Sequence, residues 1–128
     1  MSVMPVFLEK QHRFILRRKS RTIGYIEFMR LTEKEYGTPF EWNGVYLTSF
    51  YVCKQWRGNG FAKTLMEIGL SEMDKIEVPI ALYIRPFKHN DLSLDRSISK
   101  DRLREFYRKF GFRMKRTKVD KGRWMTRT

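Results

Sequence analysis

Cysteine is nearly absent from this 128-residue chain, which has only Cys53. One cysteine excludes an intramolecular disulfide framework, and no CxxC pair or cluster of histidine and cysteine has the spacing of a metal site. We therefore expect no bound metal and a reducing compartment, the cytoplasm. Long hydrophobic runs are missing as well. The longest nearly apolar stretch, Val45 to Cys53, is interrupted by Thr48 and Ser49 and is far too short to cross a bilayer, so we expect no membrane partner.

Acidic residues are also scarce, with 14 Asp and Glu against 27 Lys and Arg, and the formal net charge is +13. This excess produces a positive field over much of the surface, so we expect an anionic partner. Nucleic acid, an acidic protein surface and the phosphates of a nucleotide cofactor all satisfy that expectation. The chain is no disordered basic tail, because 41% of its residues are hydrophobic and 15% are aromatic. With no linker or internal repeat, residues 1–128 are expected to form a single domain.

The N-terminal half is rich in short β-branched and aromatic segments. The segments Arg13 to Arg18 and Ile23 to Met29 alternate partly between apolar and polar residues, which predicts an antiparallel hairpin. A second hairpin is predicted around Asn43-Gly44, the pair best suited to the positive φ angles of a two-residue turn. Its outgoing strand is expected to run from Val45 to Val52.

Helices and strands alternate in the C-terminal half. A helix is predicted from the glycine-rich stretch to about Lys75, because apolar residues recur there at three- and four-residue spacing. Pro79 to Ile84 is typical of a buried strand. A last helix is predicted to end at Gly111, and residues 112–118 and 123–126 are expected to form a terminal hairpin. The apolar stripe of that helix consists of Leu103, Phe106, Tyr107 and Phe110. The fold class is therefore mixed α/β (α+β), a mostly antiparallel sheet with one parallel pair and flanking helices.

The stretch between the long strand and the following helix carries the pattern Gln55-x-x-Gly58-x-Gly60. A glycine-rich turn at a helix N-terminus exposes backbone amides that, together with the helix dipole, can hold a pyrophosphate. Arg57 and Lys63 add positive charge nearby. The spacing is neither that of a P-loop nor that of a dinucleotide-binding fingerprint, and the pattern alone also fits an ordinary strand-to-helix turn.

Two motifs resemble the GNAT-type N-acetyltransferase superfamily. The run Gln55-Trp56-Arg57-Gly58-Asn59-Gly60 fills the family's acetyl-coenzyme A pattern Q/R-x-x-G-x-G/A, and Phe61-Ala62 continues into a helix as in the family. The run Phe106-Tyr107-Arg108-Lys109-Phe110-Gly111-Phe112 is similar to the family's F-Y-x-x-x-G-F segment. The two motifs occur in the family's order, and the resemblance covers roughly Tyr46 to Phe112. It implies a GNAT-like fold, acetyl-coenzyme A as co-substrate, and transfer of its acetyl group to a primary amine.

The resemblance also implies roles for individual residues. Backbone groups of Phe50, Tyr51 and Val52 would pair with the pantetheine arm, and one of these amides would polarise the thioester carbonyl. Tyr107 matches the family's tyrosine that protonates the departing coenzyme A thiolate, a task for a phenol with a pKa of about 10. A core tyrosine on an apolar stripe is the alternative for Tyr107. The amides that would hold the pyrophosphate belong to Gln55, Trp56, Arg57, Gly58, Asn59, Gly60, Phe61 and Ala62.

The sequence departs from the family in two places. The family has one or two helices between its first two strands, but Lys19 to Thr22 is too short for a helix. This implies reduced N-terminal helices and an open acceptor side. The link from Phe87 to Lys100 is longer than is usual in the family, so it forms either a lid or acceptor contact, or a plain surface loop.

No carboxylate lies on the central strand to act as the general base that an amine acceptor requires. The candidates are Glu27 and Glu41 on neighbouring strands, His89 in the long link, and a bound water molecule. Cys53 is interpreted as a small packing residue rather than as a nucleophile.

A different class of function is a non-catalytic, basic nucleic-acid-binding or interaction protein on a GNAT-like fold. The charge supports this alternative, but no helix-turn-helix, zinc-finger or RNP1 pattern does. The acceptor amine stays open among proteins, polyamines, small amines and aminoacyl-tRNA, and could be associated with nucleic acid. The choice between monomer and homodimer stays open as well.

Overall fold

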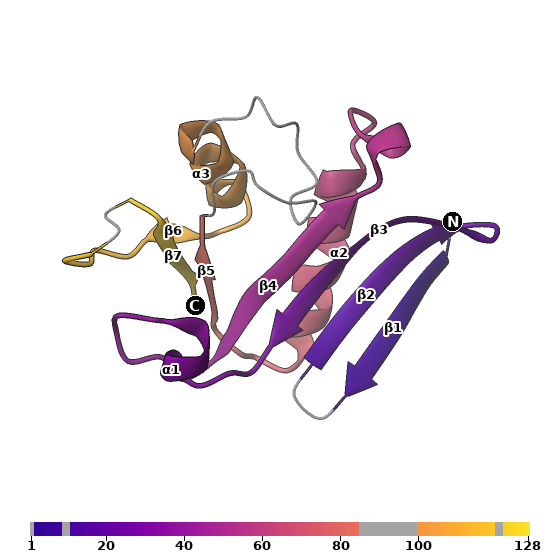
Figure 1. Ribbon diagram of the computed structural model, residues 1–128. Coiled ribbons are helices and arrows are strands. Elements are labelled where there is room, and N and C mark those ends of the chain that lie inside the picture. Colours follow the sequence, from indigo (N-terminus) through magenta and orange to yellow (C-terminus); the bar gives the residue numbers. More distant parts are fainter. Residues whose placement is uncertain (1, 9–10, 85–99, 120–121) are drawn as a thin grey trace.

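The computed structural model describes residues 2–8, 11–84, 100–119 and 122–128. Its strands form one seven-stranded sheet in the order β1-β2-β3-β4-β5-β7-β6 (Figure 1). Neighbouring strands are antiparallel except β4 and β5, which are parallel, so the predicted mixed class and its single parallel pair are confirmed. The strand bounds are β1 Ser2–Leu8, β2 Gln11–Arg18, β3 Arg21–Met29, β4 Val45–Val52, β5 Ile80–Tyr83, β6 Arg113–Met114 and β7 Trp124–Arg127.

Four helical segments accompany the sheet within the described residues: α1 Glu33–Tyr36, the short 3-10 helix η1 Lys54–Trp56, α2 Phe61–Lys75 and α3 Lys100–Arg108. The long helix α2 packs against β2, β3 and β4. At Gly69 a Cβ atom would lie 3.0 Å from side-chain atoms of Ile26 and Phe28, so glycine lets the helix approach β3 closely. The buried face of α2 consists of Leu65, Met66, Gly69, Leu70 and Met73. Four of these belong to the predicted apolar stripe; its fifth residue, Ala62, is half-buried, and Leu70 was not predicted.

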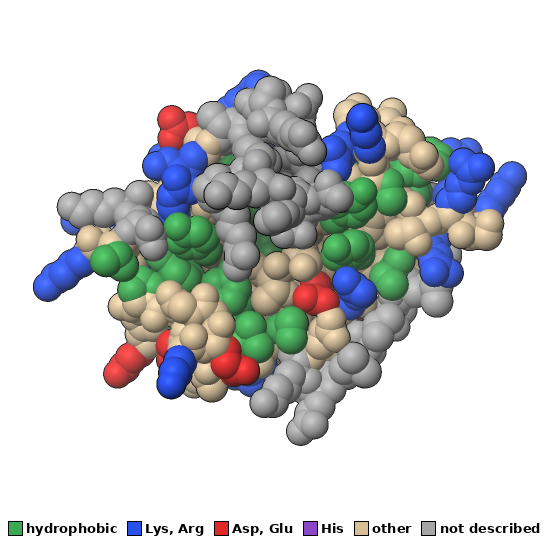
Figure 2. All heavy atoms as spheres, viewed as in Figure 1, with side chains coloured by type: hydrophobic (Ala, Val, Ile, Leu, Met, Phe, Trp, Pro, Cys, Tyr) green, Lys and Arg blue, Asp and Glu red, His purple; other side chains and the backbone are tan. Residues whose placement is uncertain are grey.

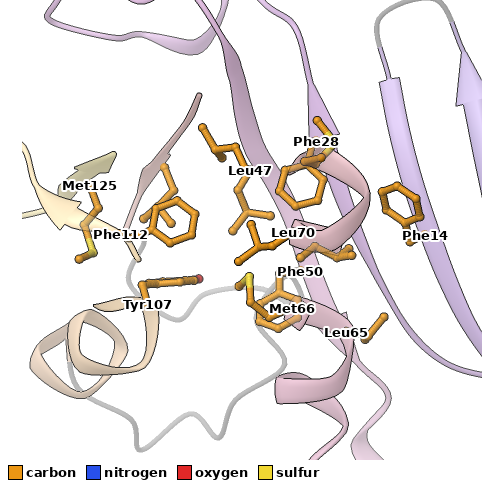
Figure 3. Close-up of a cluster of buried hydrophobic side chains, with 14 of the residues drawn as sticks. Phe14, Phe28, Leu47, Phe50, Leu65, Met66, Leu70, Tyr107, Phe112 and Met125 are labelled. Atoms are coloured by element: carbon orange, nitrogen blue, oxygen red, sulfur yellow. The ribbon is translucent and has the colours of Figure 1, made fainter. Parts of the chain in front are cut away.

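The main hydrophobic core lies between α2, α3 and one face of the sheet (Figure 3). The other face of β4 carries Tyr46, which forms a second cluster with Trp124 and packs against Tyr36 of α1. A β-bulge at Thr48 shifts the register of β4 against β3. The main core receives four residues of β4: Val45, Leu47, Phe50 and Val52.

The hairpin predicted around Asn43-Gly44 is wrong. Residues 40–43 form no strand, and β4 pairs with β3 and β5 instead. Gly44 has no positive φ. It is buried beside Pro79, where a Cβ atom would collide with the Pro79 carbonyl oxygen, so close packing rather than a turn requires glycine at this position.

The remaining predicted elements are found in the structure. The first hairpin corresponds to β2 and β3, the glycine-rich stretch leads into α2, α3 ends before Gly111, and β6 and β7 form a shortened terminal hairpin. Neither β1 nor α1 was predicted from the sequence. Among the described residues before β4, α1 is the single helix, which agrees with the expected reduction of the N-terminal helices.

Candidate active site

β4 and β5 begin side by side and then diverge. Their parallel pairing is limited to Val45 with Ile80 and Tyr46 with Ala81, whereas β4 stays paired with β3 as far as Val52. Beyond Tyr46, the edge of β4 that faces β5 therefore has no strand partner among the described residues. Figure 1 shows the two strands separating toward their carboxyl ends. An extended ligand can bind such an edge through backbone hydrogen bonds.

Alternation along β4 decides which peptide groups face this opening. The amide of Cys53, just after β4, donates to a β3 carbonyl at 2.7 Å, and successive residues of a strand turn their peptide groups to opposite sides. Phe50 and Val52 thus turn their peptide groups to the opening, while Tyr51 turns its own toward β3. The Val52 carbonyl already accepts a hydrogen bond from the Arg57 guanidinium at 2.9 Å. The Val52 amide and the amide and carbonyl of Phe50 have no partner strand among the described residues, so a ligand can bind to them.

The loop between η1 and α2 is shaped by its glycines. Gly58 and Gly60 both have a φ of 81°, a left-handed value that glycine adopts without strain. Gly60 is the N-cap of α2, and among the described residues beyond the chain neighbours no atom lies within 4 Å of a Cβ atom added to either glycine, so these residues leave the space above the loop open. The first turn of a helix leaves its amides without intrahelical acceptors, which places hydrogen-bond donors beside that space. The Asn59 side chain donates to the Trp56 and Arg57 carbonyls at 3.2 Å and closes the turn.

Basic and aromatic side chains surround the loop. Arg57 lies over the Tyr51 ring at 5.6 Å, and Arg18 lies over the Trp56 ring at 5.9 Å. Trp56 also meets the ring of Phe61 edge-on at 5.9 Å, which ties the start of α2 to the tip of the β2–β3 hairpin. Figure 2 shows Lys and Arg side chains gathered at this end of the molecule. The residues that the sequence assigned to pyrophosphate binding run from η1 through the loop into the first turn of α2: Gln55, Trp56, Arg57, Gly58, Asn59, Gly60, Phe61 and Ala62.

Tyr107 lies on α3 at the edge of the main core. Only 4% of its surface is exposed, and its ring packs against Phe106 and Phe112 at centroid distances of 5.6 and 5.9 Å. Phe106 in turn stacks on Phe50 at 6.1 Å, which ties α3 to β4. Figure 3 shows the phenol extending from α3 toward side chains of α2 and β4. Burial, and secondly the charge of Tyr36, raise the pKa of Tyr107 above its ordinary value, so the phenol stays protonated at neutral pH.

A second hydroxyl of this region, that of Tyr36 at the end of α1, was not predicted from the sequence. This hydroxyl donates to the Leu47 carbonyl at 3.5 Å. Leu47 is the first residue of β4 beyond the last pair with β5. The signal that could have revealed α1 is Thr32-x-x-Glu35, a capping box that marks the start of a helix.

Glu27 is a buried carboxylate of β3 beside the β4 bulge. It is 7% exposed, and because its two chain neighbours belong to the main core, Glu27 points to the face of the sheet opposite α2. Its carboxylate accepts hydrogen bonds from Thr48 Oγ1 at 2.8 Å and from the Gln11 side-chain amide, and Arg13 Nε lies 3.5 Å away. Thr48 is the bulged residue, so the carboxylate borders the part of β4 that has left β5.

The other candidate residues lie elsewhere. Glu41 is exposed and outside any strand. The Cys53 thiol donates to the Thr22 carbonyl at 3.2 Å, on the β3 side of β4. His89 and the link 87–99 that contains it lie outside the described residues. No group of three or more metal-ligating side chains occurs in the described part of the chain.

Comparison with known families finds one match. The family model described as the acetyltransferase (GNAT) domain matches residues 9–114 of the chain. Among curated proteins, none matches the chain. The described helices include none that is long and apolar enough to span a membrane.

Several solved structures are similar to the chain. The PaiA N-acetyltransferase of Thermoplasma acidophilum in complex with coenzyme A is 19% identical over 93% of this chain and 61% of its own, with a TM-score of 0.61. The acetoin utilization protein of Exiguobacterium sibiricum is 18% identical over 94% of this chain and 61% of its own, with a TM-score of 0.68. The anti-CRISPR protein AcrVA5 is 24% identical over 100% of both chains, with a TM-score of 0.54. The chain thus spans about three fifths of the length of the first two proteins. At these identities the likeness shows the fold.

Proposed function

Because the chain belongs to the GNAT acetyltransferase family, we propose that it transfers the acetyl group of acetyl-coenzyme A to a primary amine. The observation that carries this proposal is the divergence of β4 from β5 next to two left-handed glycines at the start of α2. A structure of the same fold, the PaiA N-acetyltransferase, is a complex with coenzyme A, which supports the choice of donor.

The loop before α2 fits the diphosphate of coenzyme A. Phosphate oxygens would accept hydrogen bonds from the amides between Gly58 and Ala62, where the glycines leave open space and the helix dipole favours negative charge. The Arg57 guanidinium lies beside the same loop, held by the Val52 carbonyl. The peptide groups of Phe50 that face the opening would pair with the pantetheine arm. With the diphosphate at the loop, this pairing would place the pantetheine arm and its thioester along β4.

The chemical step joins the amine nitrogen to the acetyl carbon and breaks the bond between that carbon and sulfur. In the tetrahedral intermediate the former carbonyl oxygen carries negative charge, which the amide of Phe50 would stabilise. The electron pair of the breaking bond goes to sulfur, and Tyr107 donates the proton that completes the thiol. Because burial raises the pKa of Tyr107, the phenol is protonated at neutral pH and has a proton to donate.

Glu27 would serve the acceptor side of the reaction. It borders the bulge of β4 on the face opposite α2, whereas Tyr107 belongs to the core on the α2 side. The proton acceptor and the proton donor would therefore act from opposite faces of the same strand. A carboxylate in this place can take the proton of the attacking amine directly or through a water molecule. The amine would approach from the face of Glu27.

Release of free thiol tests the proposal. The purified chain is incubated with acetyl-coenzyme A and a panel of amines that includes a lysine peptide, a polyamine and a small primary amine. We expect thiol release that depends on the amine, and calorimetric binding of coenzyme A in the absence of acceptor. A chain that binds neither coenzyme A nor its acetyl thioester would overturn the proposal.

Binding of a polyanion is a second candidate function, favoured by a row of stacked side chains across β2, β3 and β4. Arg13 lies over the Tyr25 ring at 4.4 Å, Tyr25 lies 5.7 Å from Tyr51, and Arg57 lies over Tyr51 at 5.6 Å. Arginine and tyrosine side chains of this kind bind phosphates and stack on the bases of single strands. Salt-sensitive mobility shifts of a single-stranded oligonucleotide, without acetyl-coenzyme A turnover, would favour this function over acetyl transfer.

A further inference from the structure

We propose that the acceptor amine is a lysine in an acidic peptide segment, and that Arg13 and Arg17 bind the carboxylates that flank it. This acceptor class rests on the proposed function. In that function the amine gives its proton to Glu27, so the acceptor lies over the sheet face that carries Glu27, opposite α2. The charges on this face therefore select the groups that can flank the amine.

The side chains around Glu27 follow from the strand register. Arg13 is paired with Glu27, and Tyr51 is paired with Tyr25, which stands two residues before Glu27 on β3. Paired residues, and residues two apart on a strand, share one face of a sheet. Arg17 lies four residues after Arg13 on β2 and so projects from the same face. Figure 1 shows β2, β3 and β4 in front of α2, so this face is turned toward the viewer.

Two arginines and two tyrosines form a stacked row across this face. Arg13 lies over the Tyr25 ring at 4.4 Å, and Arg57 lies over the Tyr51 ring at 5.6 Å. The two rings are 5.7 Å apart. Because β3 lies between β2 and β4, Arg13 and Tyr51 approach the Tyr25 ring from opposite sides. Stacking on a ring fixes the plane of a guanidinium group, and the edge of that plane carries the N–H donors that bind an anion.

Positive charge exceeds negative charge on this face. The strands β1 to β4 contain one acidic residue, Glu27. Arg13 Nε lies 3.5 Å from the Glu27 carboxylate, and the Arg13 side chain stays 36% exposed, so its terminal nitrogens can bind a second anion. Arg17 forms no ion pair within the described part of the chain. A further cation on the acceptor, as in a polyamine or a basic peptide, would be repelled here, whereas carboxylates would be attracted.

The stacked row favours an acidic peptide over a nucleic acid strand. Proteins that bind single strands offer ring faces on which bases stack. Here the rings of Tyr25 and Tyr51 stack on each other and on guanidinium groups, so a base would have to displace one of these neighbours. A carboxylate needs no ring face, because it accepts two parallel hydrogen bonds from the edge of a guanidinium group. Arg13 and Arg17 lie about 13 Å apart along β2, at about 3.3 Å per residue, which suits carboxylates on both sides of a lysine in an extended segment.

The test compares two blocked peptides, each with one lysine and three residues on either side of it. The flanking residues are all glutamate in one peptide and all glutamine in the other. From thiol release at low salt, kcat/KM should be about five- to thirtyfold higher for the glutamate peptide, the product of two or three exposed ion pairs. Because salt screens exposed charges, this ratio should fall below about threefold at about 0.5 M salt. A ratio near one at low salt overturns the inference.

Variants of the two arginines locate the preference. Arg13→Gln and Arg17→Gln should each lower the ratio between the peptides about threefold, and the charge reversal Arg17→Glu should lower it further. Lys109→Gln is the matched control, because it removes the same charge from an exposed position just after α3, and it should leave the ratio within about 1.5-fold of the wild type. Both peptides are assayed on one preparation, so partial unfolding cancels from the ratio. A wild-type ratio in the arginine variants overturns the inference.

Two further acceptors separate the possible failures. A single-stranded oligonucleotide with a primary amine at one end presents phosphates instead of carboxylates. If its kcat/KM exceeds that of the glutamate peptide, the acceptor is borne by nucleic acid and the inference is overturned. A small primary amine tests the chemistry alone. Turnover of this amine without a preference between the peptides overturns only the acceptor class, whereas no thiol release with any amine overturns the proposed function, and the inference falls with it.

Discussion

Replacing Gly60 by alanine separates the two reasons for a glycine in the loop before α2. The first reason is backbone conformation: at a φ of 81° an alanine is strained, at a cost of about 1–2 kcal/mol, or a loss of roughly 3–8 °C in Tm. The second reason is the ligand. Apart from the neighbouring residues in the chain, no described atom of the protein lies within 4 Å of the added Cβ, but the phosphate oxygens must come within about 3 Å of the loop amides. Losing one such charged hydrogen bond costs about 1.5–3 kcal/mol, so the Kd for coenzyme A should rise about ten- to a hundredfold.

Calorimetric titration with coenzyme A measures the second effect, and thermal unfolding measures the first. Gly37→Ala is the matched control, because Gly37 has a φ of 84°, also has no described atom beyond its chain neighbours within 4 Å of an added Cβ, and ends α1 far along the chain from the loop. Both variants should lose similar stability, and Gly60→Ala alone should lose affinity. Equal affinity in the two variants would refute the assignment of the loop to the diphosphate.

Three further predictions concern single side chains. Tyr107→Phe should lower kcat about ten- to a hundredfold and leave the calorimetric Kd for coenzyme A unchanged; an unchanged kcat would remove Tyr107 from the mechanism. Glu27→Gln should lower kcat/KM for the amine about tenfold or more in the thiol assay while coenzyme A binding persists. Full activity of this variant would mean that solvent, and not Glu27, takes the proton of the attacking amine. The hydrogen bond from Arg127 lowers the pKa of Asp74. In urea unfolding at pH 7, the free energy of unfolding of the wild type should therefore be higher than that of Asp74→Asn, by less than about 1 kcal/mol. This difference should shrink as the pH falls below about 4, and a constant difference down to pH 2 would contradict it.

Strong local patterns explain why most elements were predicted. The stripe of α2 and the alternation of β2 and β3 repeat over enough residues to define a period. The failure at Asn43-Gly44 has a physical cause: the same dipeptide suits a tight turn and a close contact, and only the tertiary fold brings Pro79 against Gly44. The helix α1 has four residues, which is too short for any helical period to be visible.

Some residues of the candidate site could likewise be predicted from the sequence, and others could not. The glycine loop and Tyr107 lie in short contiguous motifs, so their residues could be assigned from the sequence. The place of Tyr36 depends on where β4 leaves β5, which is set by the packing of the sheet and by no local pattern. Glu27 could be named as a candidate base, but its contacts with Gln11 and Thr48 required the strand register.

The bulge at Thr48 explains how one strand serves both faces of the site. Side chains of a regular strand alternate with a period of two, so Leu47 and Phe50, three residues apart, would point to opposite faces. The extra residue puts both into the core, where Phe50 stacks on Phe106 and so positions α3 with Tyr107. The same bulge places the Thr48 hydroxyl against the Glu27 carboxylate on the other face. One inserted residue therefore aligns the proposed proton donor and the proposed base across β4, next to the point where β5 departs.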